Sequence, residues 1–214
     1  MISITKKISI AALSVGIIAN AFAQKVDAKA KTILDQVSAN YKAKKNTYFK
    51  FLYGSGSGKV QKTQTGIFYS EGAKYKLKIM GTEQIFDGKK IYNITDEDQE
   101  VTIAVPNENA VLFSPTSYLD DYKKGYQISY IGKRNIAGIS TDLIQMKPVG
   151  KNEVKAVYLF INTVKNELVK LEQYTNNNEV AVIQIQDYKY NQNLNSNLFN
   201  FDKNQYKNYI ITEL

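Results

Sequence analysis

The chain of 214 residues contains no cysteine, no histidine and no tryptophan, and Arg134 is its one arginine. Without thiol or imidazole groups, the sequence excludes disulfides, the usual zinc sites, Ser-His-Asp triads and catalytic cysteines. A lone arginine does not supply the basic cluster that phosphate or nucleic-acid recognition usually requires. We therefore expect a protein that is not an enzyme, has no metal site and no cofactor, and does not bind nucleic acid.

Apolar and aromatic residues are what the chain has in abundance. Apolar residues make up 43% of it, which is enough for a sizeable core, and the 16 tyrosines and 9 phenylalanines favour strands over helices. The length allows one domain or at most two small ones. No boundary is visible, and we expect residues 24–214 to form a single, mainly β domain.

The first 23 residues have the pattern of a secretory signal peptide. Lys6 and Lys7 precede an apolar run, 8–18, that is short for a membrane span, and the residues at 21–23 are Ala-Phe-Ala. Because no cysteine stands at the cleavage point to carry a lipid anchor, we expect a soluble periplasmic protein. Loss of the two lysines lowers the formal net charge from +8 to +6. We interpret this excess as a solvated lysine face, with anionic headgroups or an acidic partner as the alternative.

Periodicity predicts one long helix followed by many strands. Apolar residues recur at helical spacing over 27–44, with Asp27 as the N-cap, and the period changes to two from Thr47 onward. Residues 74–79 alternate almost perfectly, which predicts a strand with one buried and one wet face. A second helix is expected over 114–124, and an edge contribution at 198–201. About ten or eleven antiparallel strands must curl or split to bury their apolar face, and the helices are the obvious cover.

The motifs that could carry chemistry are weak. The Gly-Ser-Gly-Ser-Gly run at 54–58 suggests a phosphate loop, but no helix follows it, and we interpret it as a hairpin loop. Asp120 and Asp121 are adjacent on the expected helix and point about 100° apart, so they do not form a carboxylate pair. The acidic residues at 97–100 lack the calcium-loop pattern. A hydrolase that uses only Asp, Glu, Tyr and Lys stays open as an alternative.

With these elements placed, the chain resembles the LolA family of periplasmic carriers of outer-membrane lipoproteins. The resemblance spans about 27–201 and depends on the order of several blocks. They are the leading amphipathic helix, Gly-Ile-Phe-Tyr at 66–69, the alternating strand at 75–79, Glu-Gln-Ile-Phe-Asp-Gly-Lys-Lys-Ile-Tyr-Asn at 83–93, the Ser-Pro helix start at 114–115, Leu-Val-Lys-Leu at 168–171 and Phe-Asn-Phe at 199–201.

The resemblance implies a curved antiparallel sheet that forms an incomplete, half-open β-barrel, with helices as a lid over an apolar cavity. The implied function is to shield the acyl chains of lipoproteins between an inner-membrane exporter and an outer-membrane acceptor, as a chaperone-like transport protein. One departure concerns the lid. Family members from other lineages carry a latching arginine after the turn that here reads Ser-Glu-Gly-Ala, 70–73, so closure must use apolar contacts or another polar pair.

Within this interpretation, the lid and the cavity wall can be assigned by residue. The expected lid side chains are Ile33, Leu34, Val37 and Leu119. The expected wall consists of Phe49, Phe51, Tyr75, Leu77, Ile79, Ile85, Tyr92, Ile103 and Leu143. A plain filled core has the same sequence pattern, so the two remain alternatives for each residue.

Two other functions compete with lipoprotein transport. The domain could carry another amphiphile, such as a glycolipid or a phospholipid, because a fold does not specify a headgroup. It could also be a periplasmic interaction or sensory module that binds a protein partner by strand addition. No apolar surface helix requires a partner, so we expect a monomer.

Overall fold

The computed structural model describes residues 26–106, 118–121, 123 and 125–214. The expected signal peptide, 1–23, and the expected helix start at 114–115 lie outside these residues. The helices and strands are α1 Ala28–Lys42, β1 Asn46–Ser57, β2 Lys62–Glu71, β3 Lys74–Ile79, β4 Thr82–Phe86, β5 Ile91–Thr95, β6 Glu100–Ala104, α2 Tyr118–Asp121, β7 Tyr126–Ile136, β8 Ile139–Pro148, β9 Val154–Asn162, β10 Glu167–Thr175, β11 Glu179–Tyr190, the 3-10 turn Lys203–Tyr206 and β12 Ile210–Glu213.

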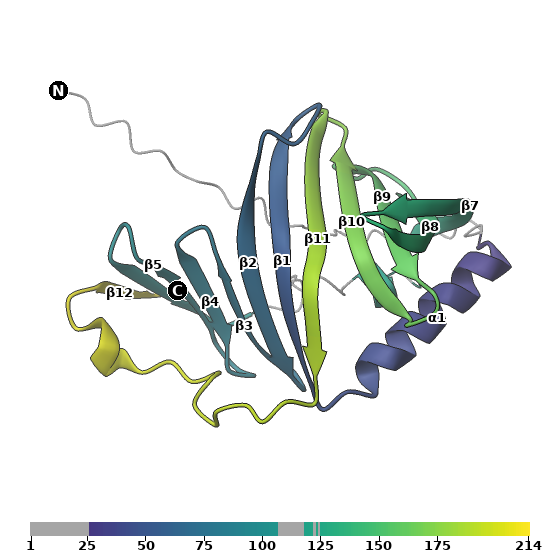
Figure 1. Cartoon of the computed structure of the whole chain (residues 1–214). Helices are drawn as coiled ribbons and strands as arrows, with labels where there is room; N and C mark the ends of the chain where they lie inside the picture. The colour runs from purple at the N-terminus through teal and green to yellow at the C-terminus, as the bar shows by residue number, and fades with distance from the viewer. Residues whose placement is uncertain (1–25, 107–117, 122, 124) are drawn as a thin grey trace.

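The strands form one curved sheet that does not close. Their order is β12-β6-β5-β4-β3-β2-β1-β11-β10-β9-β8-β7, so β12 and β7 are the two edges. Every pairing is antiparallel except that of β12 with β6, which is parallel. Figure 1 shows the long strands β2, β1, β11 and β10 at the centre, with α1 running obliquely beside β7 to β10. The prediction of a mainly β, half-open barrel with a helical cover is confirmed, with twelve strands in place of ten or eleven.

Helix α1 begins where the sequence predicts and ends at Lys42, two residues before the expected end. The Asp27 side chain accepts hydrogen bonds from the backbone N–H groups of Lys29 (2.9 Å) and Ala30 (3.0 Å), which are otherwise unsatisfied at a helix start. These bonds lower the pKa of the exposed Asp27 carboxyl, the Ala30 bond most strongly. Its apolar stripe, with Leu34 and Val37 fully buried, faces the sheet. The face of the sheet that α1 covers is called the inner face below.

Paired residues of neighbouring strands place apolar side chains on the inner face across the sheet. Phe49 of β1 lies beside Phe68 of β2, and Phe68 lies beside Leu77 of β3. On the other side, Leu159 of β9 pairs with Ile144 of β8. These residues belong to one buried cluster that also contains the apolar stripe of α1. The inner face is therefore the main core of the molecule.

Beyond β3, the apolar side of the sheet changes. The two-residue turn at Met80-Gly81 pairs Leu77 with Gln84, so polar side chains continue the inner face onto β4 and β5. Most apolar residues of β4 to β6 point to the outer face, where they form a second buried cluster, whereas Phe86 at the end of β4 stays in the inner-face cluster. The C-terminal tail covers that cluster; Phe201 stacks on Tyr92 with 4.6 Å between ring centroids. In Figure 1 this tail, in yellow, passes below the central strands to reach β12.

Two sequence expectations about elements were wrong, and a third lies partly outside the described residues. The glycine run at 54–58 is not simply a loop, because β1 continues to Ser57. A Cβ at Gly54 or Gly56 would come within 2.5 Å of Val60 or Lys59 in the connection to β2, so glycine permits this close approach. The edge contribution falls at Ile210–Glu213 and not at 198–201, because Phe201 is used for packing on the outer face. Of the expected 114–124 helix, the structure describes a short helix, α2, over Tyr118–Asp121.

Candidate functional site

The lid residues and part of the expected wall meet in the inner-face cluster. Ile33, Leu34, Val37 and Leu119 lie in the same buried cluster as Phe49, Phe51, Tyr75 and Leu77, and Ile79 packs against it while partly exposed. The structure therefore brings the two helices and strands β1 to β3 together, as the lid-and-wall interpretation requires.

The other four expected wall residues lie on the outer face. Ile85, Tyr92 and Ile103 pair with one another across β4, β5 and β6 and belong to the cluster that the C-terminal tail covers. Leu143 pairs with Phe160, one position out of phase with the inward-facing Ile144. A shift of one residue along a strand moves a side chain to the opposite face. These four residues are not in the part of the molecule that α1 covers.

Aromatic rings form a continuous row across the inner face. Tyr188, Phe49, Phe68, Tyr75 and Phe86 come from β11, β1, β2, β3 and β4, and successive ring centroids are 5.0, 5.9, 5.7 and 5.7 Å apart. Burial raises the pKa of the Tyr75 hydroxyl, which donates to the Gln84 side chain at 2.5 Å. The row is a broad apolar surface with a polar border at β4 and β5.

A glycine makes room for a further aromatic ring, that of Phe51, beside this row. Phe51 is fully buried and lies opposite Gly66 of β2. A Cβ at position 66 would be 2.4 Å from the Phe51 ring, so the ring occupies the place of a side chain. The Gly in Gly-Ile-Phe-Tyr thus serves aromatic packing.

Helix α1 is fastened at both ends. At its start, Val26 forms a bridge with Ile128 of the edge strand β7, and the Asp27 N–H donates to the Ile128 carbonyl at 3.1 Å. At its other end, the Asn40 side-chain amide donates to the Asn166 carbonyl at 3.0 Å. Helix α1 otherwise packs mainly against α2, β7 and β10. It spans the interior without being part of the sheet.

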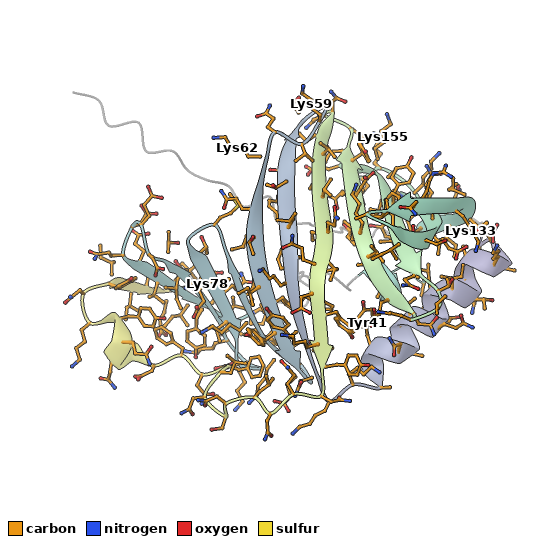
Figure 2. The ribbon with its side chains drawn as sticks, in the orientation of Figure 1. Tyr41, Lys59, Lys62, Lys78, Lys133 and Lys155 are labelled. Carbon is orange, nitrogen blue, oxygen red and sulfur yellow. The ribbon has the colours of Figure 1, made fainter. Side chains whose placement is uncertain are left out.

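The last turn of α1 carries a further polar contact that the sequence did not reveal. The Tyr41 hydroxyl accepts a hydrogen bond of 3.0 Å from the backbone N–H of Leu168, at a bulge where β10 is out of register with β9. The Tyr41 ring also meets Phe49 and Tyr188 edge to face, and its label in Figure 2 lies between α1 and the sheet. Asn40 and Tyr41 thus hold the end of the helix against the turn before β10 and the start of that strand. No signal in the spacing marks them as partners of a turn 125 residues away.

A groove of about 570 Å³ opens beside this end of α1. Its lining includes Asn40 and Lys44 from the end of α1, Lys165 and Glu167 at the start of β10, and Tyr188 of β11. We call it the α1-end groove. Partial burial raises the pKa of the Glu167 carboxyl, although Lys165 and Lys44 lower it. Burial also raises the pKa of Tyr188, whose hydroxyl oxygen is inaccessible and has no hydrogen-bond partner among the described residues.

A second hollow, of about 390 Å³, lies on the outer face between β1, β2, β10 and β11. Leu52, Val60 and Val182 supply its apolar side. Lys170 and Glu172, which also line it, form an ion pair of 2.6 Å. These two charged groups are therefore already paired with each other.

Across 26–106, 118–121, 123 and 125–214, no three carboxylates gather as metal ligands. Asp142 is a buried carboxylate with assigned partners: burial raises its pKa, but hydrogen bonds from Tyr130 and Thr163 and the charges of Lys133 and Lys29 lower it overall. The main feature of the site is the apolar inner face of the sheet beneath α1.

Comparison with known proteins shows which solved structures share this fold. No family model matches the chain, and no curated protein matches it. An uncharacterised conserved protein from Thermus thermophilus superposes with a TM-score of 0.61 at 11% identity, over 87% of this chain and 99% of that one. The two chains share a fold.

Two weaker structural likenesses were also found. One is to the lipoprotein LppX of Mycobacterium tuberculosis, with a TM-score of 0.49 and 13% identity over 79% of this chain and 98% of that one. The other is to a putative outer-membrane lipoprotein-sorting protein domain from Vibrio parahaemolyticus, with a TM-score of 0.46 and 11% identity over 84% and 98% of the two chains.

Proposed function

We propose that this protein is a periplasmic carrier that buries the acyl chains of lipoproteins on the inner face of its sheet, beneath α1, and moves them from the inner to the outer membrane. The observation that carries the proposal is the placement of Leu34 and Val37. These fully buried side chains of a separate helix belong to the same buried cluster as the aromatic row. Displacement of α1 would uncover a surface suited to hydrocarbon.

The energetics of such an exchange suit a shuttle. An acyl chain of about 16 carbons gains on the order of 13 kcal/mol on burial, at about 0.8 kcal/mol per methylene. Exposing Ile33, Leu34 and Val37 costs about 1.5–3 kcal/mol each, or roughly 5–9 kcal/mol together. The difference of about 4–8 kcal/mol corresponds to dissociation constants from about 1 mM to about 1 µM. Cargo held this weakly can be released to an acceptor.

The attachment of α1 supports its role as the moving part. Its connections to the sheet include a two-residue contact at β7, the Lys29 ammonium 3.6 Å from the centroid of the Tyr130 ring, the bonds of Asn40 and Tyr41, and apolar packing. None of these is part of a strand ladder, so α1 can leave while the twelve-stranded sheet stays intact. The described residues include no helix long and apolar enough to cross a bilayer.

The test is transfer of a membrane-embedded lipoprotein. The purified protein is incubated with vesicles that contain a lipoprotein and its exporter, and the soluble fraction is analysed by native mass spectrometry. We expect a one-to-one complex of protein and lipoprotein. An Ile79→Glu variant, with a carboxylate at the partly exposed end of the inner wall, should lose the complex, whereas Ile131→Glu, at an exposed isoleucine of β7, should keep it. Equal transfer by both variants would show that the inner face does not hold the cargo.

A free amphiphile is the second candidate cargo. The groove at the end of α1 favours it, because this groove presents both positive and negative side chains where an acyl chain under α1 would reach the surface. Mass spectrometry of protein purified from its host separates the two candidates, since lipoprotein and phospholipid masses differ.

A further inference from the structure

The α1-end groove is continuous with the apolar interior. Leu168, which lines the groove, is buried in the inner-face cluster. Ile185 and Tyr188 also line it and pack against the same cluster while partly exposed. A hydrocarbon chain under α1 could therefore reach the surface along these three side chains. Whatever polar group the chain carries would lie in the groove.

Charges of both signs surround the groove in equal number. Lys44 and Lys165 are the two cations, and Glu167 and Asp187 are the two anions. Two of the four already have partners: the Lys44 ammonium lies 4.3 Å from the centroid of the Tyr190 ring, and Asp187 pairs with Lys189 at 3.2 Å. Lys165 and Glu167 form no ion pair with any residue in the described part of the chain. One cation and one anion are thus left for a ligand.

Of these two charged groups, Glu167 is the one that is partly buried. A partly buried carboxylate without a cationic partner costs free energy, because burial disfavours the charged form. An ammonium group supplied by a ligand would remove that cost. The exposed Lys165, at the turn before β10, is placed to meet an anion at the mouth of the same groove.

We propose that the α1-end groove holds the headgroup of a zwitterionic phospholipid, with its phosphate at Lys165 and its ammonium at Glu167. The volume of about 570 Å³ is in the range of small-ligand sites. This inference rests on the proposed burial of acyl chains beneath α1, and it names a free phospholipid as a cargo class.

The test compares three lipids that share one dodecanoyl chain. Lysophosphatidylethanolamine carries both charges, lysophosphatidic acid carries the phosphate alone, and monododecanoylglycerol carries neither. Their affinities are measured by displacement of an apolar fluorescent dye from the full-length mature protein, with circular dichroism as the check on folding. The variants are Lys165→Glu and Glu167→Gln, and Lys155→Glu is the matched control at an exposed lysine of β9, away from the groove (Figure 2).

Lys165→Glu should weaken lysophosphatidylethanolamine roughly tenfold and leave monododecanoylglycerol unchanged, while Lys155→Glu changes neither. Glu167→Gln should weaken lysophosphatidylethanolamine but strengthen lysophosphatidic acid, because it removes the repulsion of the phosphate. If the glycerol ester binds and the charged lipids show the same affinities in all variants, the headgroup inference is wrong and acyl-chain binding stands. If none of the three lipids binds, acyl-chain binding itself fails, and the headgroup site fails with it.

Discussion

Replacing Tyr41 by Phe tests whether α1 opens separately from the sheet. The change keeps the ring between Phe49 and Tyr188 and removes the one atom that accepts the hydrogen bond from Leu168. Leu168 is 3% exposed, so its N–H would be left buried and unsatisfied at a cost of about 1–3 kcal/mol. If that cost falls on the closed position of α1, the equilibrium for opening rises about 5- to 150-fold.

Hydrogen exchange of the native protein measures this directly. In the unmodified chain, the amides of α1 should already exchange through an opening of lower free energy than that of the central strands β1 and β11. Tyr41→Phe should lower the hydrogen-exchange protection factors of the α1 amides about 5- to 150-fold. Tyr48→Phe is the control, because the Tyr48 ring packs at a tilt against Tyr69, outside the inner-face cluster. The reasoning is refuted if the amides of α1 and of β1 show equal protection before and after the change, since α1 would then unfold only with the whole sheet.

Two further predictions concern stability. Gly66→Ala would place a Cβ 2.4 Å from the fully buried Phe51 ring, and we expect a loss of about 1–3 kcal/mol in urea unfolding; an unchanged midpoint would show that the ring moves freely. The pKa of Asp142 is depressed in the folded state, so its stabilisation is present above the unfolded value of about 3.9 and is lost as pH falls through the lower folded value. Asp142→Asn should therefore flatten the acid limb of the stability profile, and an identical limb in both proteins would contradict this assignment.

The elements with strong local periodicity were predictable from the sequence. Helix α1 starts at the expected N-cap because Asp27 satisfies the first N–H groups, a purely local effect. Strand β3 alternates so regularly that its buried face follows from the spacing of Tyr75 and Leu77. In both cases the signal lies within one element, and no distant residue is needed to read it.

The prediction from sequence placed Ile85, Tyr92 and Ile103, of strands β4 to β6, on the wrong face of the sheet. Part of the information needed to avoid this error was present in the sequence. The turn at Met80-Gly81 has two residues, which fixes Gln84 opposite Leu77 and turns Ile85 outward. An inward Gln84 is the sequence clue that the apolar side has changed. What sequence could not supply was the cover for Ile85, because the tail that packs there follows more than 100 residues later.

Neutral hydrogen bonds fasten the end of α1 to the rest of the protein. An arginine latch would be a charged contact whose strength varies with salt, whereas the bonds of Asn40 and Tyr41 are neutral. The exposed pair of Asp35 and Lys123, at 3.8 Å, adds about 0–1 kcal/mol at most. Against these bonds stands the buried hydroxyl of Tyr188, which has no partner within the described residues and costs about 1–3 kcal/mol. The stabilisation from the hydrogen bonds of Asn40 and Tyr41 is thus similar in size to the cost of the unsatisfied Tyr188 hydroxyl. The burial of the apolar stripe of α1 is therefore the main free-energy term that keeps the helix against the sheet. If a hydrocarbon chain competes for the same apolar surface, as we propose, occupancy of the inner face and opening of α1 become a single equilibrium.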